Sequence, residues 1–385
     1  MKRLFLLLAG TALLAACREE EEIIPSTGTV VTPGENAGPI AGFFLLNEGN
    51  MGSNKATLDY FDYETGVYTK NIYAERNPGV VKELGDVGND IQVYGSKLYI
   101  VVNCSHFVEV MDARTAKHIT QLSIPNCRYI VFKDRHAYIS SYAGPVKIDP
   151  NARLGYVARV DTADLARPAI DTCVVGYQPE EMVIVGDKLY VANSGGYRVP
   201  DYDRTVSVID LASFKVIQTI TVGINLHRLE VDNRGYIYVS SRGDYYGTPS
   251  KTYVIDSRTD KVVDELPLLP NSNMTLRGDS LYVYSTEWSY ITHRWSISYA
   301  ILNTLTRKVV TRSFIKDGTE KQIRVPYGIA VHPVTGEILV TDAKDYVTPG
   351  TIYCFTPDGK KKWSEVTGDI PAHVAFTREK LEPKK

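Results

Sequence analysis

The sequence from Gly186 to Gly223, GDKLYVANSGGYRVPDYDRTVSVIDLASFKVIQTITVG, contains three runs in which apolar and polar residues alternate. Lys188–Ala192, Val206–Asp210 and Val216–Val222 each have the two-residue period of a β-strand, and turn-forming residues separate them. They predict three antiparallel strands, and Pro179–Val185 supplies a fourth strand just before them. Because such a sheet has apolar residues on both faces, it needs neighbouring copies to bury them.

Copies of this unit recur along the chain. The opening strand returns as GSKLYIVVNC, DRHAYISSYA, RGYIYVSSRG, GDSLYVYSTE and GEILVTDAKD, which begin at Gly95, Asp134, Arg234, Gly278 and Gly336. The repeat period is roughly 41 to 55 residues, a range typical of propeller blades and solenoids. Four strands in each period favour the propeller.

The two ends of the repeat region complement each other. Phe43–Gly49 matches the second strand of a blade that lacks its first strand, and Pro371–Thr377 matches a first strand with nothing after it. The C-terminal strand should therefore complete the first blade and close the ring. The sequence predicts an all-β fold over residues 43–385: a seven-bladed β-propeller of four-stranded antiparallel blades.

The N-terminus has the features of an exported lipoprotein. Residues 1–16 carry Lys2 and Arg3 before an apolar run too short to span a bilayer, which is typical of a signal peptide. The sequence LLAAC that ends at Cys17 resembles a bacterial lipobox, which implies cleavage and lipidation of Cys17. Stable anchoring through acyl chains follows. Residues 17–42 are rich in Pro, Gly, Thr and Ser, and we predict a flexible tether.

Four consecutive glutamates, Glu19–Glu22, follow the lipidated cysteine. This acidic cluster resembles the surface-export signal of Bacteroidetes lipoproteins, which implies an outer-membrane protein exposed at the cell surface. A solvated acidic linker is the alternative interpretation. The exported location would also permit a disulfide between Cys104 and Cys127, but sequence fixes no distance, so a bridge and two separate thiols both stay open.

The composition is that of an ordinary globular protein, with 44% hydrophobic and 23% charged residues. The net charge of -2 gives no basic footprint for nucleic acid, so we expect no nucleic-acid partner. Tyrosine is unusually frequent, with 26 residues against 10 Phe and 3 Trp. Tyrosine suits wet binding surfaces, although many of these residues occupy strand positions and are expected to pack between blades.

Propeller topology predicts where a ligand binds. The loops that enter each innermost strand lie on the same face as the loops that join the second and third strands, around the central channel. The alternative is that these loops are polar and variable without a shared role. The candidate ligand-binding residues at these positions are Asp90, Asn103, Arg128, Tyr142, Glu180, Asn193, Tyr202, Arg228, Arg242, Tyr246, Trp288, Tyr327, Tyr346 and His373.

The sequence contains no recognisable catalytic set. No histidine pair has metal-ligand spacing, and neither a GxSxG nor a phosphate-binding loop occurs. His106, His227 and His373 could each reach a metal, but a lone histidine in a loop is more often a surface hydrogen-bonding group. We therefore predict no enzyme, no metal and no cofactor. A ring of polar and aromatic residues favours binding of a large, neutral, amide-rich ligand.

The KLYVANSG…VSVID pattern resembles the YVTN repeat of YncE-like seven-bladed propellers, over roughly residues 43–380. As a surface lipoprotein, the chain is similar to the BtuG-type cobalamin-binding lipoproteins of Bacteroidetes. The resemblance implies that cobalamin or a related corrinoid binds the channel face, as ligand and not cofactor, and passes to an outer-membrane TonB-dependent transporter. The lipid anchor would be the sole membrane attachment. A propeller that binds protein or glycan, and a metal- or quinone-dependent propeller enzyme, are the alternatives.

The chemistry of a corrin indicates which candidate residues would contact which part of the ligand. A corrin presents a broad apolar plane fringed by amides. Aromatic residues would pack on the plane and polar residues would bond the fringe. The expected packing residues are Tyr202, Tyr246, Trp288 and Tyr346, and the expected polar ones are Asn103, Asn193, Arg128 and Arg242.

Overall fold

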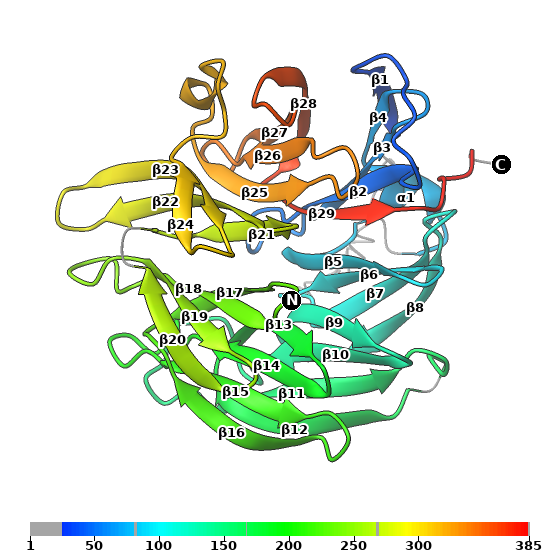
Figure 1. Cartoon of the computed structure of the whole chain (residues 1–385). Helices are drawn as coiled ribbons and strands as arrows, with labels where there is room; N and C mark the ends of the chain where they lie inside the picture. The colour runs from blue at the N-terminus through cyan, green and yellow to red at the C-terminus, as the bar shows by residue number, and fades with distance from the viewer. Residues whose placement is uncertain (1–24, 81–82, 167, 267–268, 384–385) are drawn as a thin grey trace, which may run out of the picture.

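Seven β-sheets are arranged around a central axis in the computed structural model, which describes residues 25–80, 83–166, 168–266 and 269–383 (Figure 1). Six sheets are blades of four consecutive antiparallel strands. Their strands are β5 (Gly88–Tyr94), β6 (Lys97–Val102), β7 (Phe107–Asp112), β8 (His118–Ser123); β9 (Cys127–Lys133), β10 (His136–Ser141), β11 (Leu154–Asp161), β12 (Ile170–Tyr177); β13 (Pro179–Val185), β14 (Lys188–Asn193), β15 (Thr205–Asp210), β16 (Lys215–Thr221); β17 (Leu226–Val231), β18 (Tyr236–Ser241), β19 (Lys251–Asp256), β20 (Lys261–Leu266); β21 (Asn273–Arg277), β22 (Ser280–Ser289), β23 (Arg294–Asn303), β24 (Lys308–Thr311); and β25 (Pro326–Val331), β26 (Ile338–Asp342), β27 (Pro349–Phe355), β28 (Lys361–Asp369).

The first blade joins the two ends of the chain. Its innermost strand is β29 (Pro371–Thr377), which pairs antiparallel with β2 (Gly42–Asn47), and β3 (Thr57–Asp62) and β4 (Val67–Lys70) follow outward. In Figure 1 the red β29 lies beside the blue β2. The predicted seven-bladed all-β propeller, closed by the C-terminal strand, is confirmed.

One segment of the expected tether is part of the sheet. Strand β1 (Thr27–Val30) pairs with β4 and adds a fifth strand to the first blade. All four of its residues are exposed, and no hydrophobic alternation marks it in the sequence. Its backbone covers the edge of β4, which would otherwise present unpaired groups. Cys17 and Glu19–Glu22 lie outside the described residues.

The hydrophobic core lies between adjacent blades. Tyr99, Tyr190 and Tyr238 occupy the same position of the repeated opening strand and are almost completely buried, which accounts for part of the tyrosine content as blade packing. Between the first and last blades, the rings of Phe61 and Trp363 stack at a centroid distance of 4.9 Å. Burial of both faces of each sheet is therefore achieved by the neighbours, as the repeat requires.

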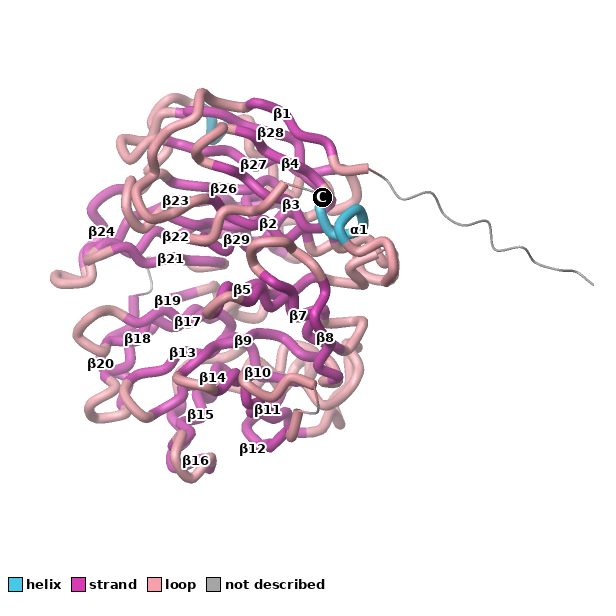
Figure 2. Tube along the Cα trace, turned by 90° about the vertical axis from the view of Figure 1, so that its right-hand side faces the viewer, coloured by secondary structure: helices cyan, strands magenta, loops and turns pink. Residues whose placement is uncertain are grey.

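Helix is scarce in the described part of the chain (Figure 2). Helix α1 (Ile72–Arg76) packs beside β3, and a short 3-10 turn, η1 (Thr319–Lys321), follows the sixth blade. Neither reaches the length or apolar character needed to cross a membrane, and this holds for every helix among the described residues.

Four cysteines lie in the described residues, and all four are free thiols: Cys104, Cys127, Cys173 and Cys354. The disulfide that the sequence left open between Cys104 and Cys127 is not formed. The Cys127 Sγ instead lies 3.3 Å from the carbonyl oxygen of Phe107. Burial raises the pKa of Cys127 to about 12, so this thiol is a poor nucleophile at neutral pH.

Closure by β29 predicts that the chain does not tolerate its removal. A chain ending at Gly368 loses the pairing with β2 and the packing of Phe376, whose ring lies 6.0 Å from that of Phe43. We expect it to lose about 3 kcal/mol or more of unfolding free energy, as measured by denaturant unfolding. A chain ending at Pro383, which keeps β29, is the control. Equal midpoints for the two chains would contradict closure by this strand.

The free thiols give a second prediction, on a chain in which Cys17 has been replaced. Under denaturing, non-reducing conditions, four thiols should react with a thiol reagent, because no bridge joins Cys104 to Cys127. In the native protein the Cys127 thiol should react far more slowly than in the denatured chain, because its pKa is raised by burial. A count of two in the denatured chain would show that the bridge exists.

Candidate functional site

The innermost strands share an irregularity near their first residues. In six of the seven blades, the pairing register between the innermost strand and its neighbour shifts at this point, and the innermost strand carries one extra residue. Such β-bulges redirect side chains out of the regular alternation. The bulges contain Asn89 in β5, Arg128 and Tyr129 in β9, Glu180 and Glu181 in β13, His227 and Arg228 in β17, Tyr327 and Gly328 in β25, and Ala372 in β29.

Three of these bulges are held by the same hydrogen bond. The second bulge residue donates its backbone N–H to a hydroxyl on the residue opposite, in the second strand of the blade. The pairs are Tyr129 with Ser140 at 3.1 Å, Arg228 with Ser240 at 2.8 Å, and Gly328 with Thr341 at 2.7 Å. The repeat therefore fixes a bulge that turns polar side chains toward the axis of the ring.

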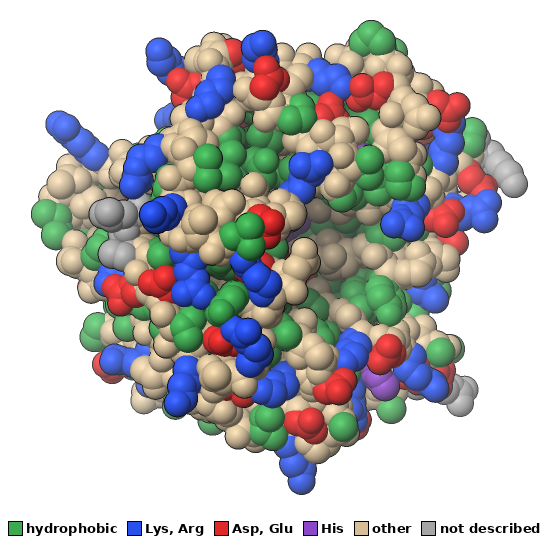
Figure 3. Space-filling model, viewed as in Figure 1, with side chains coloured by type: hydrophobic (Ala, Val, Ile, Leu, Met, Phe, Trp, Pro, Cys, Tyr) green, Lys and Arg blue, Asp and Glu red, His purple; other side chains and the backbone are tan. Residues whose placement is uncertain are grey.

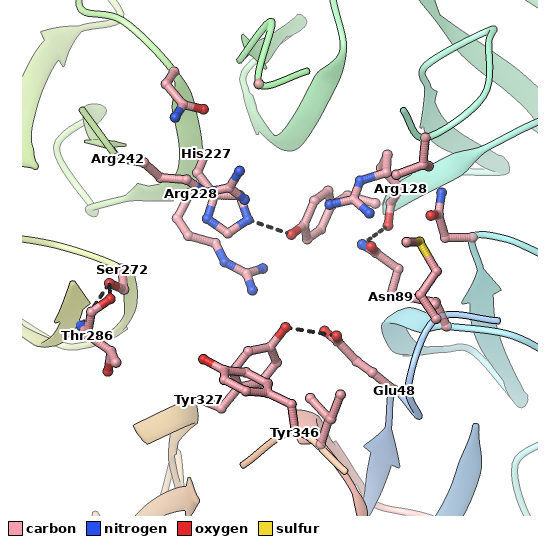
Figure 4. A pocket seen from close by; sticks show the side chains of 18 of the residues that line it. Glu48, Asn89, Arg128, His227, Arg228, Arg242, Ser272, Thr286, Tyr327 and Tyr346 are labelled. Carbon is pink, nitrogen blue, oxygen red and sulfur yellow. Dashed lines mark hydrogen bonds between the residues drawn. The ribbon is translucent and has the colours of Figure 1, made fainter. Parts of the chain in front are cut away.

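These side chains surround a central cavity of about 590 Å³. Every blade contributes to its lining, through the bulges and through the loops that join second and third strands. In Figure 4 the labelled side chains approach the cavity from opposite sides. The volume lies within the range of small-molecule sites.

One side of the cavity, which we call the arginine wall, consists of Arg128, Arg228 and Arg242 with His227 and Tyr129. Behind it, Glu180 is completely buried. The Nε and Nη2 atoms of Arg128 donate to Glu180 Oε2 at 3.1 and 3.0 Å, and Arg242 Nη1 lies 3.6 Å from Oε1. Burial disfavours the charged form of Glu180, but the two guanidinium groups outweigh burial and hold its pKa below the usual range.

The remaining members of the arginine wall meet around Tyr129. The guanidinium groups of Arg228 and Arg128 lie 5.0 and 5.8 Å from the centroid of its ring. Its hydroxyl lies 2.9 Å from His227 Nε2 (Figure 4). Burial, followed by the positive charges of Arg242, Arg228 and Arg128, lowers the pKa of His227 well below its usual value. His227 is therefore neutral at pH 7.

The opposite side, which we call the tyrosine wall, consists of Tyr284, Tyr327 and Tyr346 with Glu48. The Tyr327 hydroxyl donates to Glu48 Oε2 at 2.8 Å, and the Tyr346 ring packs edge-on against Tyr327 at 5.9 Å. Burial raises the pKa of Tyr346 to about 12. The wall therefore presents neutral phenols and flat apolar surface across from the arginines.

Nine of the predicted residues belong to the cavity or its immediate support. Seven line it: Asn103, Arg128, Tyr142, Arg228, Arg242, Tyr327 and Tyr346. Two stand behind the lining and hold it in place. Glu180 binds Arg128 and accepts a 2.6 Å hydrogen bond from Tyr142, and His373 Nε2 lies 3.2 Å from Glu48 Oε1.

The other five predicted residues lie elsewhere. Asp90 Oδ2 accepts the backbone N–H of Ile130 at 2.9 Å and so links two blades, and Asn193 is buried within its own blade against Thr205 and Ser207. The remaining three lie outside the cavity lining, two on loops and the last in β22, because the pairing of β22 with β23 continues to Ser289 and replaces the loop that the sequence predicted there. These are Tyr202, Tyr246, which stacks on Tyr290 at 5.1 Å, and Trp288, which packs on Trp295 at 5.4 Å.

Four residues of the arginine and tyrosine walls are absent from the predicted set: Glu48, Tyr129, His227 and Tyr284. Glu48 and His227 occupy loop and strand-entry positions of the kind used for the prediction. Tyr129 is the second residue of a bulge. The sequence signal for it is Ser140 in the neighbouring strand, whose hydroxyl holds the bulge and so turns both Arg128 and Tyr129 toward the axis. Tyr284 comes from within β22, where sequence alternation gives no sign of a cavity.

The cavity region carries charges of both signs. In the space-filling view, basic and acidic side chains intermingle over the molecule, and the surface is hollowed near the centre of the ring (Figure 3). Among the residues that the structure describes, no group of three His, Cys, Asp or Glu residues is placed to hold a metal ion.

Comparison with solved structures identifies the same fold in proteins of different activities. A quinonprotein alcohol dehydrogenase-like protein from Bacteroides thetaiotaomicron has a TM-score of 0.57 at 14% identity, with 88% of this chain and 78% of that chain covered. For apo AztD from Citrobacter koseri the TM-score is 0.52 at 12% identity, with coverages of 87% and 97%. For Kuenenia stuttgartiensis hydrazine synthase it is 0.54 at 16%, with coverages of 70% and 77%. At these identities the similarity extends to the fold alone.

Sequence comparison identifies the family to which the chain belongs. A search of curated proteins found no match. The model of one family, described as a domain of unknown function (DUF5074), matches residues 41–362. This range contains five complete blades, together with β2–β4 of the first blade and β25–β27 of the last, and it ends at the start of β28. The chain therefore belongs to the DUF5074 family.

Proposed function

We propose that this protein is a cell-surface lipoprotein that binds a corrinoid in the central cavity and passes it to an outer-membrane TonB-dependent transporter. The observation that supports binding most directly is the pair of unlike walls. Three guanidinium groups and amide side chains face three tyrosines across one cavity. A ligand with a broad apolar plane and many amide acceptors would satisfy both walls at once.

The individual groups suit such a ligand. Tyr327 and Tyr346 offer ring surface to the plane of a corrin, while Asn89, Arg128 and Arg242 carry donors for carbonyl oxygens on its fringe. Most of these side chains are anchored by neighbours, as Arg128 is by Glu180. Anchored side chains lose little conformational freedom on binding, which favours affinity. The resemblance to BtuG-type lipoproteins provides independent support for this ligand class.

We propose binding rather than catalysis, and the second candidate function is binding of protein or glycan. It is favoured by exposed aromatic residues outside the cavity: Tyr246, on the loop between β18 and β19, is 61% exposed, and Trp295, in β23, is 47% exposed. Exposed aromatic groups of this kind are enriched in macromolecular interfaces. The two candidates use different residues, so substitutions in the cavity and substitutions of these exposed aromatic residues separate them.

Calorimetric titration of the purified protein with cobalamin tests the corrinoid proposal. Tyr346→Ala should weaken binding by about 30-fold, the loss of about 2 kcal/mol typical of a buried aromatic anchor. Tyr94→Ala is the matched control, because Tyr94 ends β5 at the side away from the cavity. No heat and no shift of the melting temperature with excess cobalamin would overturn the proposal. Binding unaffected by Tyr346→Ala but lost in Trp288→Ala would move the site from the cavity to the aromatic residues around it.

The location proposal rests on the sequence around Cys17 and has its own test. Cys17→Ala should release the protein from the membrane fraction, because the anchor is acyl chains on this residue. Replacement of Glu19–Glu22 by alanine should leave the protein anchored but protect it from protease added to intact cells. If protease still removes this variant as fast as the parent protein, the acidic cluster does not direct surface export.

A further inference from the structure

The positive charge of the arginine wall is only partly compensated by the carboxylates beside it. Arg128 and Arg242 share one buried carboxylate, that of Glu180. Arg228 has a longer contact, 3.4 Å from Nη1 to Glu181 Oε1, and the other oxygen of Glu181 already accepts the backbone N–H of Leu229 at 2.7 Å. Burial raises the pKa of Glu181 and of Asp90, which weakens both as counter-charges. Three guanidinium groups thus face the cavity with incomplete neutralisation.

Two buried polar atoms on this wall lack a partner within the described residues. They are Nε of Arg228 and Nδ1 of His227. Arg228 is 8% exposed and His227 is 9% exposed. Both residues line the cavity, and Figure 4 shows the Arg228 guanidinium extending between the two walls. A buried polar group without a partner destabilises the structure that holds it, because it has lost its hydrogen bonds to water without replacing them. A ligand group that reaches these atoms replaces those hydrogen bonds.

We infer that Arg128, Arg228 and Arg242, together with His227, form an oxyanion subsite that holds a phosphate group of the ligand. Guanidinium groups match the geometry of phosphate oxygens and stay charged at all physiological pH values. His227, neutral at pH 7, adds hydrogen bonding without adding charge. If the ligand is a corrinoid, as in the proposed function on which this step rests, the subsite holds the phosphodiester in the nucleotide loop of a complete corrinoid.

The tyrosine wall determines how the ligand is oriented in the cavity. Glu48 lies among the tyrosines and is held there by Tyr327 and His373. Its carboxylate disfavours an anion on that side, whereas the arginine wall favours one. The phosphate should therefore lie toward the blades of β9, β13 and β17, and the corrin plane toward the tyrosine wall.

Inorganic phosphate is the first probe, titrated calorimetrically into the full chain against chloride at matched ionic strength. We expect phosphate to bind and Arg228→Gln to weaken it by about tenfold or more, the loss typical of a charge-assisted hydrogen bond. Arg228→Lys, which keeps the charge, should lose less. Arg258→Gln is the control, because Arg258 is exposed in the turn between β19 and β20 and pairs with Asp256. Melting temperatures establish that each variant is folded.

Two corrinoids form the second pair of probes: cobalamin, and cobinamide, which lacks the nucleotide loop and its phosphate. The parent protein should bind cobalamin more tightly, and Arg242→Gln or Arg228→Gln should reduce that preference by about tenfold. Equal Arg228 dependence for both corrinoids, with no phosphate binding, would overturn the subsite and leave the corrinoid proposal standing. Arginine-dependent phosphate binding without binding of either corrinoid would support the subsite and overturn its assignment to a corrinoid.

Discussion

The apolar character of both faces of every blade is the constraint on which this structure depends. A four-stranded sheet with two apolar faces is unstable alone, and a row of such sheets would leave one face bare at each end. Pairing of β29 with β2 removes both ends by closing the row into a ring. The interior between blades is then continuous, with aromatic packing such as that of Phe61 on Trp363 across the first and last blades.

Closure also creates the site. Because the innermost strands all start on one face, a bulge repeated at the start of most of them directs polar side chains toward a single axis. The serine or threonine that holds the bulge belongs to the repeat, while the residues inside the bulge differ from blade to blade. The scaffold is thus uniform and the lining is individual, which allows one fold to serve the different activities of its structural relatives.

Burial gives the cavity its electrostatic character. Glu180 stays ionised because two guanidinium groups outweigh the cost of its burial, and His227 stays neutral because the same guanidinium groups add to that cost. The tyrosines opposite remain protonated, since burial raises their pKa values. At neutral pH one wall is therefore cationic and the other largely uncharged apart from Glu48.

The sequence by itself determined the fold, because strand periodicity, the repeat and the complementary ends at Phe43 and Thr377 are local signals that admit one closed arrangement. It also placed Arg128, Arg228 and Tyr327 at the cavity through topology. Only the tertiary structure showed that two predicted residues do not face the axis: Asp90 accepts a hydrogen bond from the next blade, and Asn193 donates one within its own blade. It alone paired β1, whose exposed side chains carry no pattern, and brought Glu180 between Arg128 and Arg242. The physical reason is that a bulge reverses the direction of a side chain and ion pairs join residues far apart in the chain, and neither effect leaves a periodic trace in the sequence.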